Sequence, residues 1–168
     1  DGALKAALDA HGYEEGSAAA LERMVEAETE TLILHEVGEH EAAALLGPGW
    51  ERSLCGLERR GAAILMRAVR DHLADCLVTL PELVERHADA SLHLWFANLD
   101  GMRRELFPRV QDAYRAWLGG DRGQALLATA KVGAEHWLRA CGEVLDAIAG
   151  DGGELAVAAL ALDEALRL

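Results

Sequence analysis

Residues 18–46 read AAALERMVEAETETLILHEVGEHEAAALL, which is the longest uninterrupted helical pattern in the chain. With about 100° of rotation per residue, one stripe of this helix collects apolar side chains. They are Leu21, Met24, Val25, Leu32, Ala43 and Leu46. Glu28, His35 and Glu39 fall within the same stripe. Because buried carboxylates and imidazoles are costly unless paired or metal-bound, this stretch predicts a core helix with a polar site on its inward face.

The same periodicity continues through the rest of the chain. It predicts a short helix at residues 1–11, a second long helix at 50–77, and a third at 80–99, in which Asp89 or Ser91 could cap a restart. It further predicts a kink or a fresh helix at 108–118 and helices at 124–148 and 154–168. The run Thr79-Leu80-Pro81-Glu82 has the form of a capping box and predicts the start of the third long helix. We therefore predict an all-α, up-and-down bundle of five to seven helices, in a single domain of residues 1–168.

The composition supports a helical protein and argues against two classes of partner. The chain has 16 basic and 29 acidic residues, a formal charge of −13, which repels phosphate backbones and anionic lipid surfaces. Its apolar runs are far shorter than the roughly 20 residues needed to cross a bilayer. We therefore expect no nucleic-acid partner and no membrane partner.

The number and spacing of the cysteines indicate the cellular compartment in which the protein is found. Cys55, Cys76 and Cys141 are odd in number, widely separated and outside any C-x-x-C arrangement. This pattern favours reduced thiols in a cytoplasmic protein. The sequence does not begin with Met, so we expect it to be part of a longer chain, and any removed leader segment lies outside it.

Two predicted helices carry ligand-type residues among their apolar positions, which favours a metal site between them. His35 lies seven residues after Glu28 and four before Glu39, so these side chains stack along one line. The full candidate set is Glu28, His35, Glu39, His72, Asp75, Glu58 and His93. Carboxylates and imidazoles on facing helices suit Fe, Mn or Zn, and iron or manganese would indicate oxygen-dependent oxidation or metal storage. The paired Glu-x-x-His motif of ferritin-like proteins is absent.

The same residues also permit an interpretation without a metal. His35 would then bond to a carboxylate, and Glu39 would pair with an arginine such as Arg103 or Arg67, in a structural polar network. The function would in that case be structural or protein-binding, through a homodimer or another protein partner that contacts the Ala- and Leu-rich segment 154–168. The sequence leaves both hypotheses open and specifies no reaction.

Residues 71–108, reading DHLADCLVTLPELVERHADASLHLWFANLDGMRRELFP, resemble an uncharacterised family of bacterial helical domains, the Sfum-type domains. The resemblance extends from about Thr29 to Leu145 and implies neither an activity nor site residues. Glu28 and His35 give a looser similarity to haem-oxygenase-like di-metal oxidases, whose first core helix offers a Glu and a second ligand seven residues later. The chain departs from that family because it lacks the later cluster of His and Asp on one helix.

Overall fold

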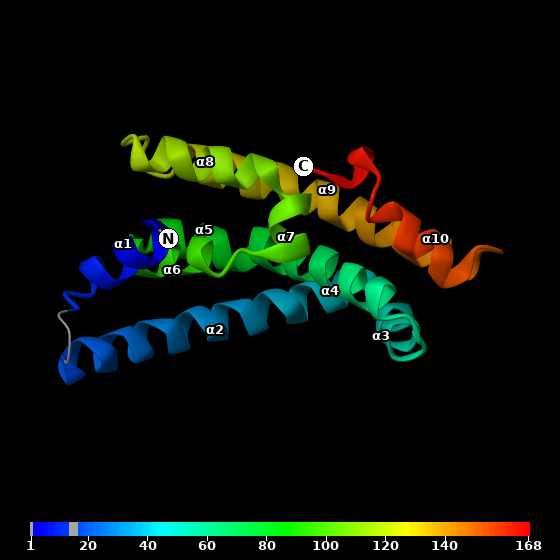
Figure 1. Cartoon of the computed structure of the whole chain (residues 1–168), viewed down its shortest axis with the longest axis horizontal. Coiled ribbons are helices and arrows are strands. Elements are labelled where there is room, and N and C mark those ends of the chain that lie inside the picture. Colours follow the sequence, from blue (N-terminus) through cyan, green and yellow to red (C-terminus); the bar gives the residue numbers. More distant parts are fainter. Residues whose placement is uncertain (1, 14–16) are drawn as a thin grey trace.

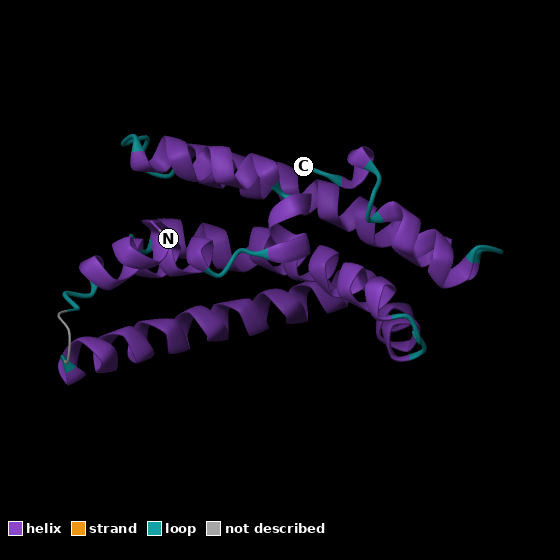
Figure 2. Cartoon of the chain, in the orientation of Figure 1, coloured by secondary structure: helices purple, strands orange, loops and turns teal. Residues whose placement is uncertain are grey.

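The computed structural model describes residues 2–13 and 17–168, and this part of the chain is almost entirely helical, with no β-strand (Figures 1 and 2). The α-helices are α1 (Gly2–Ala10), α2 (Ala18–Leu46), α3 (Pro48–Cys55), α4 (Arg60–Ala74), α5 (Leu80–Glu85), α6 (Asp89–Ala97), α7 (Gly101–Leu106), α8 (Pro108–Leu118), α9 (Gln124–Ala149) and α10 (Gly153–Leu160). A π-helical segment, η1 (Asp75–Thr79), joins α4 to α5, and a 3₁₀ turn, η2 (Glu164–Leu166), lies near the end of the chain.

The continuous rod formed by α4, η1 and α5 lies at the centre of the molecule (Figure 1). Helix α2 packs on one side of this rod and α9 on the other, while α8 and α10 pack on α9. Side chains from the rod, α3, α7–α8 and α9 fill the core, and the largest that are fully buried include Trp50, Leu65, Phe107 and Trp137. The rod is therefore enclosed on both sides, which explains its high apolar content.

Helix α2 approaches the rod through small residues. Its buried positions are Ala20, Leu34, Gly38 and Ala42. A Cβ atom added to Gly38 would lie 2.5 Å from the backbone oxygen of Ala74, so the two helix backbones are in direct contact there. His35, one turn before this contact point, and Glu39, the residue after it, are thereby brought against the end of α4.

The apolar stripe predicted for residues 18–46 is only partly correct. Met24 and Leu46 are half-buried, whereas Leu21, Val25, Leu32 and Ala43 are exposed. The helix is rotated away from the prediction because the small side chains permit a closer approach to the rod than the large aliphatic ones would. Glu28, His35 and Glu39 are half-buried and lie at the edge of the inward face.

The all-α prediction is confirmed, but the predicted number of helices is too low. The described residues form nine continuous helices, since α4, η1 and α5 run together without a break. The predicted helix 50–77 is interrupted after Cys55 and resumes at Arg60. The predicted helix 80–99 is interrupted between Glu85 and Asp89, at the restart that the sequence had left open. Helix α7 was not predicted at all. At the N-terminus α1 matches the predicted short helix, of which Asp1 lies outside the described residues.

The capping box predicted at Thr79–Glu82 is wrong. Thr79 has helical backbone angles, and its hydroxyl makes no capping hydrogen bond. The chain instead widens into a π turn, in which the amide of Leu80 donates to the carbonyl of Asp75, five residues earlier. Pro81 lacks an amide hydrogen and its ring would clash with a carbonyl in a regular α-helix, so the wider turn relieves a conflict that would otherwise end the helix.

The C-terminal helix is shorter than predicted, and the residues after it are hydrogen-bonded to the bundle. Helix α10 ends at Leu160 and packs on α9 and α4. The amide of Leu168 donates to the carbonyl of Leu106 at 2.9 Å, and its own carbonyl accepts from the amide of Arg109 at 2.9 Å. Among the residues that the structure describes, no helix has the length and apolar character that a membrane crossing requires.

Candidate functional site

A histidine–aspartate pair lies at the seam between α2 and the central rod. His35 comes from α2, and Asp75 is the first residue of the π segment. Nδ1 of His35 and Oδ1 of Asp75 are 2.9 Å apart, and Asp75 is fully buried. The second carboxylate oxygen of Asp75 accepts a hydrogen bond from Arg103 of α7. A buried carboxylate is thus matched by two partners from two different helices.

The hydrogen bonds and charges around Asp75 and His35 determine the direction in which the pKa of each group shifts. Burial disfavours the charged form of Asp75, but the hydrogen bond from His35 and the charge of Arg103 together outweigh burial and lower the pKa of this carboxyl. The hydrogen bond to Asp75 raises the pKa of His35, against the opposing effect of burial, and the nearby Asp71 and Glu39 add to the rise. Asp75 is therefore ionised, and Nδ1 of His35 carries the proton that joins them.

The other ring nitrogen of His35 faces a second group of charges. Nε2 of His35 lies 3.4 Å from Oε1 of Glu39, and a ligand atom from each of His35, Glu39 and Asp71 lies within 4.8 Å of the others. Arg70 donates from Nη2 to Glu39 at 2.5 Å and to Asp71 at 3.1 Å. Nη1 of Arg70 also lies 3.8 Å from the exposed carboxylate of Glu51. The two carboxylates next to His35 therefore share one cation.

His72 is next to this group in the sequence but faces another part of the core. It is fully buried, its ring stacks on Trp137 at 4.7 Å, and its Nε2 lies 2.9 Å from the backbone oxygen of Arg103. Burial, together with the charge of Arg103, lowers the pKa of His72 to about 3. His72 is therefore neutral and donates to this carbonyl, which fixes the position of α7 and so of the arginine that pairs with Asp75.

The remaining predicted ligands are dispersed. Glu28 lies two turns before His35, with its Oε1 buried and without a hydrogen-bond partner among the described residues, and burial raises the pKa of this carboxyl. Glu58 is exposed in the loop before α4, where its amide donates to Glu154. His93 lies on α6, and its Nδ1 is 2.7 Å from the hydroxyl of Tyr114 on α8. Glu58 and His93 thus contribute nothing to the group around His35.

Sequence reasoning missed Asp71 and Arg70 as members of the site. Asp71 precedes Asp75 by one helical turn, in the same way that His35 precedes Glu39, and this parallel spacing was the available signal. The sequence also suggested Arg67 or Arg103 as the partner of Glu39. The partner is Arg70, whereas Arg103 pairs with Asp75.

A cavity of about 240 Å³ opens beside the His35–Asp75 pair. Its lining residues are Glu28, Thr31, Leu32, His35, Asp75, Thr79, Trp95, Asn98 and Arg103. Three buried polar atoms of this lining have no hydrogen-bond partner among the described residues: Oε1 of Glu28, Oγ1 of Thr79 and Nε of Arg103. The residues around this cavity therefore hold unpaired hydrogen-bonding atoms next to an ionised pair.

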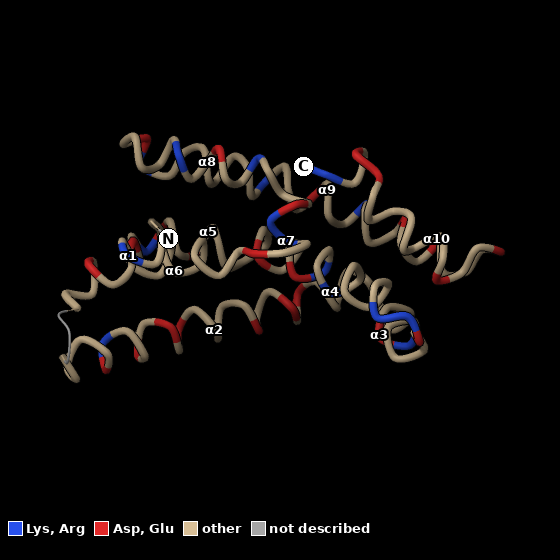
Figure 3. Tube along the Cα trace, viewed as in Figure 1, with Lys and Arg blue, Asp and Glu red and all other residues tan. Residues whose placement is uncertain are grey.

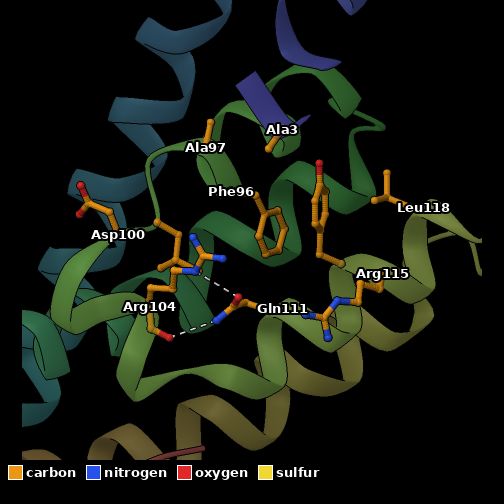
Figure 4. Close-up of a pocket in the computed structure, with 10 residues that line it drawn as sticks. Ala3, Phe96, Ala97, Asp100, Arg104, Gln111, Arg115 and Leu118 are labelled. Carbon is orange, nitrogen blue, oxygen red and sulfur yellow. Dashed lines mark hydrogen bonds between the residues drawn. The ribbon is translucent and has the colours of Figure 1, made fainter. Parts of the chain in front are cut away.

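A second cavity, of about 310 Å³, lies where α6, α7 and α8 meet α1 (Figure 4). Phe96 and Tyr114, whose rings stack on each other, form its apolar wall. Nε of Arg104 donates to the side-chain oxygen of Gln111, and the amide of Gln111 donates back to the carbonyl of Arg104, each at 3.2 Å. Because Arg104 and Gln111 are hydrogen-bonded to each other, this cavity has fewer unpaired polar groups for a ligand than the cavity beside His35.

Comparison with known proteins places the chain in a family. No curated protein and no solved structure matches it. A family model described as a family of unknown function, DUF6866, C-terminal domain, matches residues 1–164. The expectation of a family without an established activity is thereby confirmed, while the resemblance to bacterial Sfum-type domains stays a prediction. With nearly its whole length matched, the chain belongs to the DUF6866 C-terminal domain family.

Proposed function

We propose that this domain binds a divalent transition-metal ion through His35, Glu39 and Asp71. The observation that carries the proposal is the closeness of three ligand atoms, one from each residue, within 4.8 Å of one another. Asp75 supports it, because metal-ligating histidines commonly donate their other ring N–H to a carboxylate that fixes the ring orientation. With Nδ1 of His35 engaged by Asp75, Nε2 is the nitrogen available to a metal.

Arg70 is the main competitor of such an ion. Its guanidinium donates to both Glu39 and Asp71, so it supplies the positive charge that these two carboxylates require. A metal would enter as Arg70 turns toward Glu51, from which its Nη1 is only 3.8 Å away. If the site binds a metal, Arg70 therefore inhibits metal binding. If the charges form a purely structural network, Arg70 is required for the stability of that network.

The ligand set suits Fe, Mn or Zn, since one imidazole and two carboxylates are common donors for these ions. Three protein donors leave coordination positions open, as a catalytic metal needs. His35 and Glu39 are only partly buried, so solvent and small reactants have access to the site. Oxygen-dependent oxidation is the reaction class to test if the ion is iron or manganese, and metal storage is the alternative.

The decisive experiment measures metal binding to protein purified without a His-tag. Calorimetric titration with Mn²⁺, Fe²⁺ and Zn²⁺, followed by elemental analysis of the desalted protein, is expected to give roughly one ion per chain for the tightest metal. His35→Ala and Asp71→Asn are expected to weaken binding at least about tenfold, because the first removes a ligand and the second replaces a charged carboxylate ligand with a neutral amide.

Arg70→Gln is the variant that separates the two interpretations. Loss of the competing guanidinium is expected to tighten metal binding, whereas Arg67→Gln, an exposed arginine on the same helix, is expected to leave it unchanged. The proposal fails if Arg70→Gln binds no metal and only lowers the free energy of unfolding, since that result identifies the charges as a structural network.

A further inference from the structure

The outward face of α2 carries an unusual number of large apolar side chains. Val25, Leu32 and Ile33 are 66%, 64% and 57% exposed. We call this set the α2 outer face: Leu21, Val25, Leu32, Ile33 and Val37. At its centre is a shallow, almost wholly apolar groove, lined by Thr29, Leu32, Ile33, Glu36, Val37 and His40. Contiguous apolar surface of this kind marks a site of interaction.

The inward face of α2 packs against the bundle without using these residues. Its buried positions are Ala20, Leu34, Gly38 and Ala42, so most of the large aliphatic side chains of α2 are left outside the core. A helix that is apolar on both faces is typical of a helix enclosed on both sides. The bundle encloses only one side of α2, which indicates that a further element covers the other.

The charges on α2 indicate what that element is. Its exposed acidic residues are Glu22, Glu26, Glu30, Glu36 and Glu41, and Arg23 is the only exposed Lys or Arg of the helix. Acidic positions recur along the length of α2 (Figure 3). A second copy of the chain would bring the same acidic face against this one, and an anionic lipid surface would also be repelled. The complementary partner is positively charged.

We propose that the α2 outer face binds a basic amphipathic helix of a partner protein. The apolar stripe of that helix would pack along Val25, Leu32, Ile33 and Val37, in the helix-in-groove mode of recognition. Lysines and arginines beside the stripe would reach the flanking glutamates and set the orientation. Leu32 lines both this groove and the cavity beside His35 and Asp75, whereas Ile33 and Val37 line the groove alone. The packing of a partner helix on these apolar side chains needs no metal, so the proposal does not rest on metal binding.

A designed peptide provides the probe. A fluorescein-labelled helix of about 20 residues with a leucine stripe and lysine flanks is titrated with the full chain, and binding is followed by anisotropy. The double variant Leu32→Gln/Ile33→Gln is expected to weaken binding about tenfold or more, as loss of central apolar anchors does. Leu118→Gln, which changes an exposed leucine on α8, is the matched control and is expected to bind like wild type. A peptide with glutamate flanks is expected not to bind.

Three results would overturn the proposal. Equal affinity of wild type and the double variant would show that charge alone attracts the peptide. A dimer by light scattering that the double variant dissociates would identify a second copy as the occupant. Binding to neutral phosphatidylcholine vesicles that is lost in the double variant would identify a lipid surface. Circular dichroism melts check that both variants fold, which is expected because the substituted side chains face solvent.

Discussion

Gly38 is the residue on which the geometry of the candidate site depends. A side chain there would place Cβ 2.5 Å from the carbonyl oxygen of Ala74, and that oxygen belongs to a helix backbone that cannot move aside alone. Gly38→Ala is therefore expected to push α2 away from α4 and to lower the free energy of unfolding by about 1–3 kcal/mol. The same displacement would separate His35 from Asp75.

The control for this prediction is Gly142→Ala on α9. Nothing lies within 4 Å of a Cβ built at Gly142, so alanine there is expected to raise stability by about 0.5–1 kcal/mol through its helix propensity. Urea denaturation measures both values. Equal effects of the two substitutions would mean that the close contact between α2 and α4 does not exist in solution.

Thr79 gives a second prediction at the level of a single side chain. Its hydroxyl is buried beside the cavity and has no hydrogen-bond partner among the described residues. Thr79→Val replaces this hydroxyl with a methyl group of similar size, and we expect the free energy of unfolding to rise by about 1 kcal/mol. Thr31→Val, which removes a hydroxyl that donates to the carbonyl of Ala27, is the control and is expected to give no gain. A loss of stability in Thr79→Val would show that this hydroxyl has a partner, such as a water molecule in the cavity.

At the level of helices, periodicity found most elements because each buries a face on its neighbours. Periodicity could not predict which face of α2 turns toward the rod. The small residues Gly38 and Ala42 determine how closely α2 approaches the rod, and a pattern of large apolar residues does not reveal them. The π segment was also missed. Thr79 and Pro81 match a helix start locally, and only packing of the rod on both sides makes continuation through the proline favourable.

The candidate site shows the same division between local and long-range information. His35 and Asp75 are 40 residues apart, and both were placed in the candidate set because each is an ionisable residue on an apolar pattern. Arg70 and Asp71 were missed, because charged residues at the edge of a helix look like a solvated surface in the sequence. Only the contact between α2 and α4 turns them toward Glu39.

The start of α4 depends on a distant carboxylate. Arg59 precedes the helix without a side-chain cap, and Glu154 at the start of α10 accepts from the amides of both Glu58 and Arg59. These two hydrogen bonds lower the pKa of Glu154 below its ordinary value of 4.5. Because the folded-state pKa is the lower one, the stabilisation is fully present above about pH 4.5 and is lost as the pH falls through the folded-state pKa.

Glu154→Ala is therefore expected to lower Tm by a few degrees near neutral pH, and by progressively less as the pH falls below about 4.5. Glu164→Ala, at an exposed position in η2, is the control and is expected to change Tm little at any pH. Thermal melts from pH 7 to pH 3 measure the difference. A Tm difference that does not shrink in acid would contradict the capping role of this carboxylate.

For the whole molecule, the three thiols report on how the bundle opens. Cys55 is exposed at the end of α3, whereas Cys76 on the rod and Cys141 on α9 are buried. Burial raises the pKa of Cys141 to about 12 and that of Cys76 well above its ordinary value, so neither is a thiolate near pH 8. With iodoacetamide and mass spectrometry, we expect one rapid modification, at Cys55, and two slow ones that need the bundle to open. Two or more rapid modifications would contradict the packing of α9 on the rod.

The slow modifications also connect the bundle with the proposed metal site. A ligand that binds only the folded state stabilises it by RT ln(1 + [L]/Kd), which is about 2.7 kcal/mol at 100 times Kd and slows opening-limited modification about 100-fold. A metal held by His35, Glu39 and Asp71 links α2 to α4, so saturating Mn²⁺ or Zn²⁺ is expected to slow modification of Cys76 and Cys141 in wild type. In His35→Ala, which binds the ion about tenfold more weakly, the protection is expected to fall about tenfold at the same ion concentration. Cys55 is the internal control, because it is exposed without any opening and its rate should not change. Equal protection in wild type and His35→Ala would place the ion elsewhere on this acidic chain.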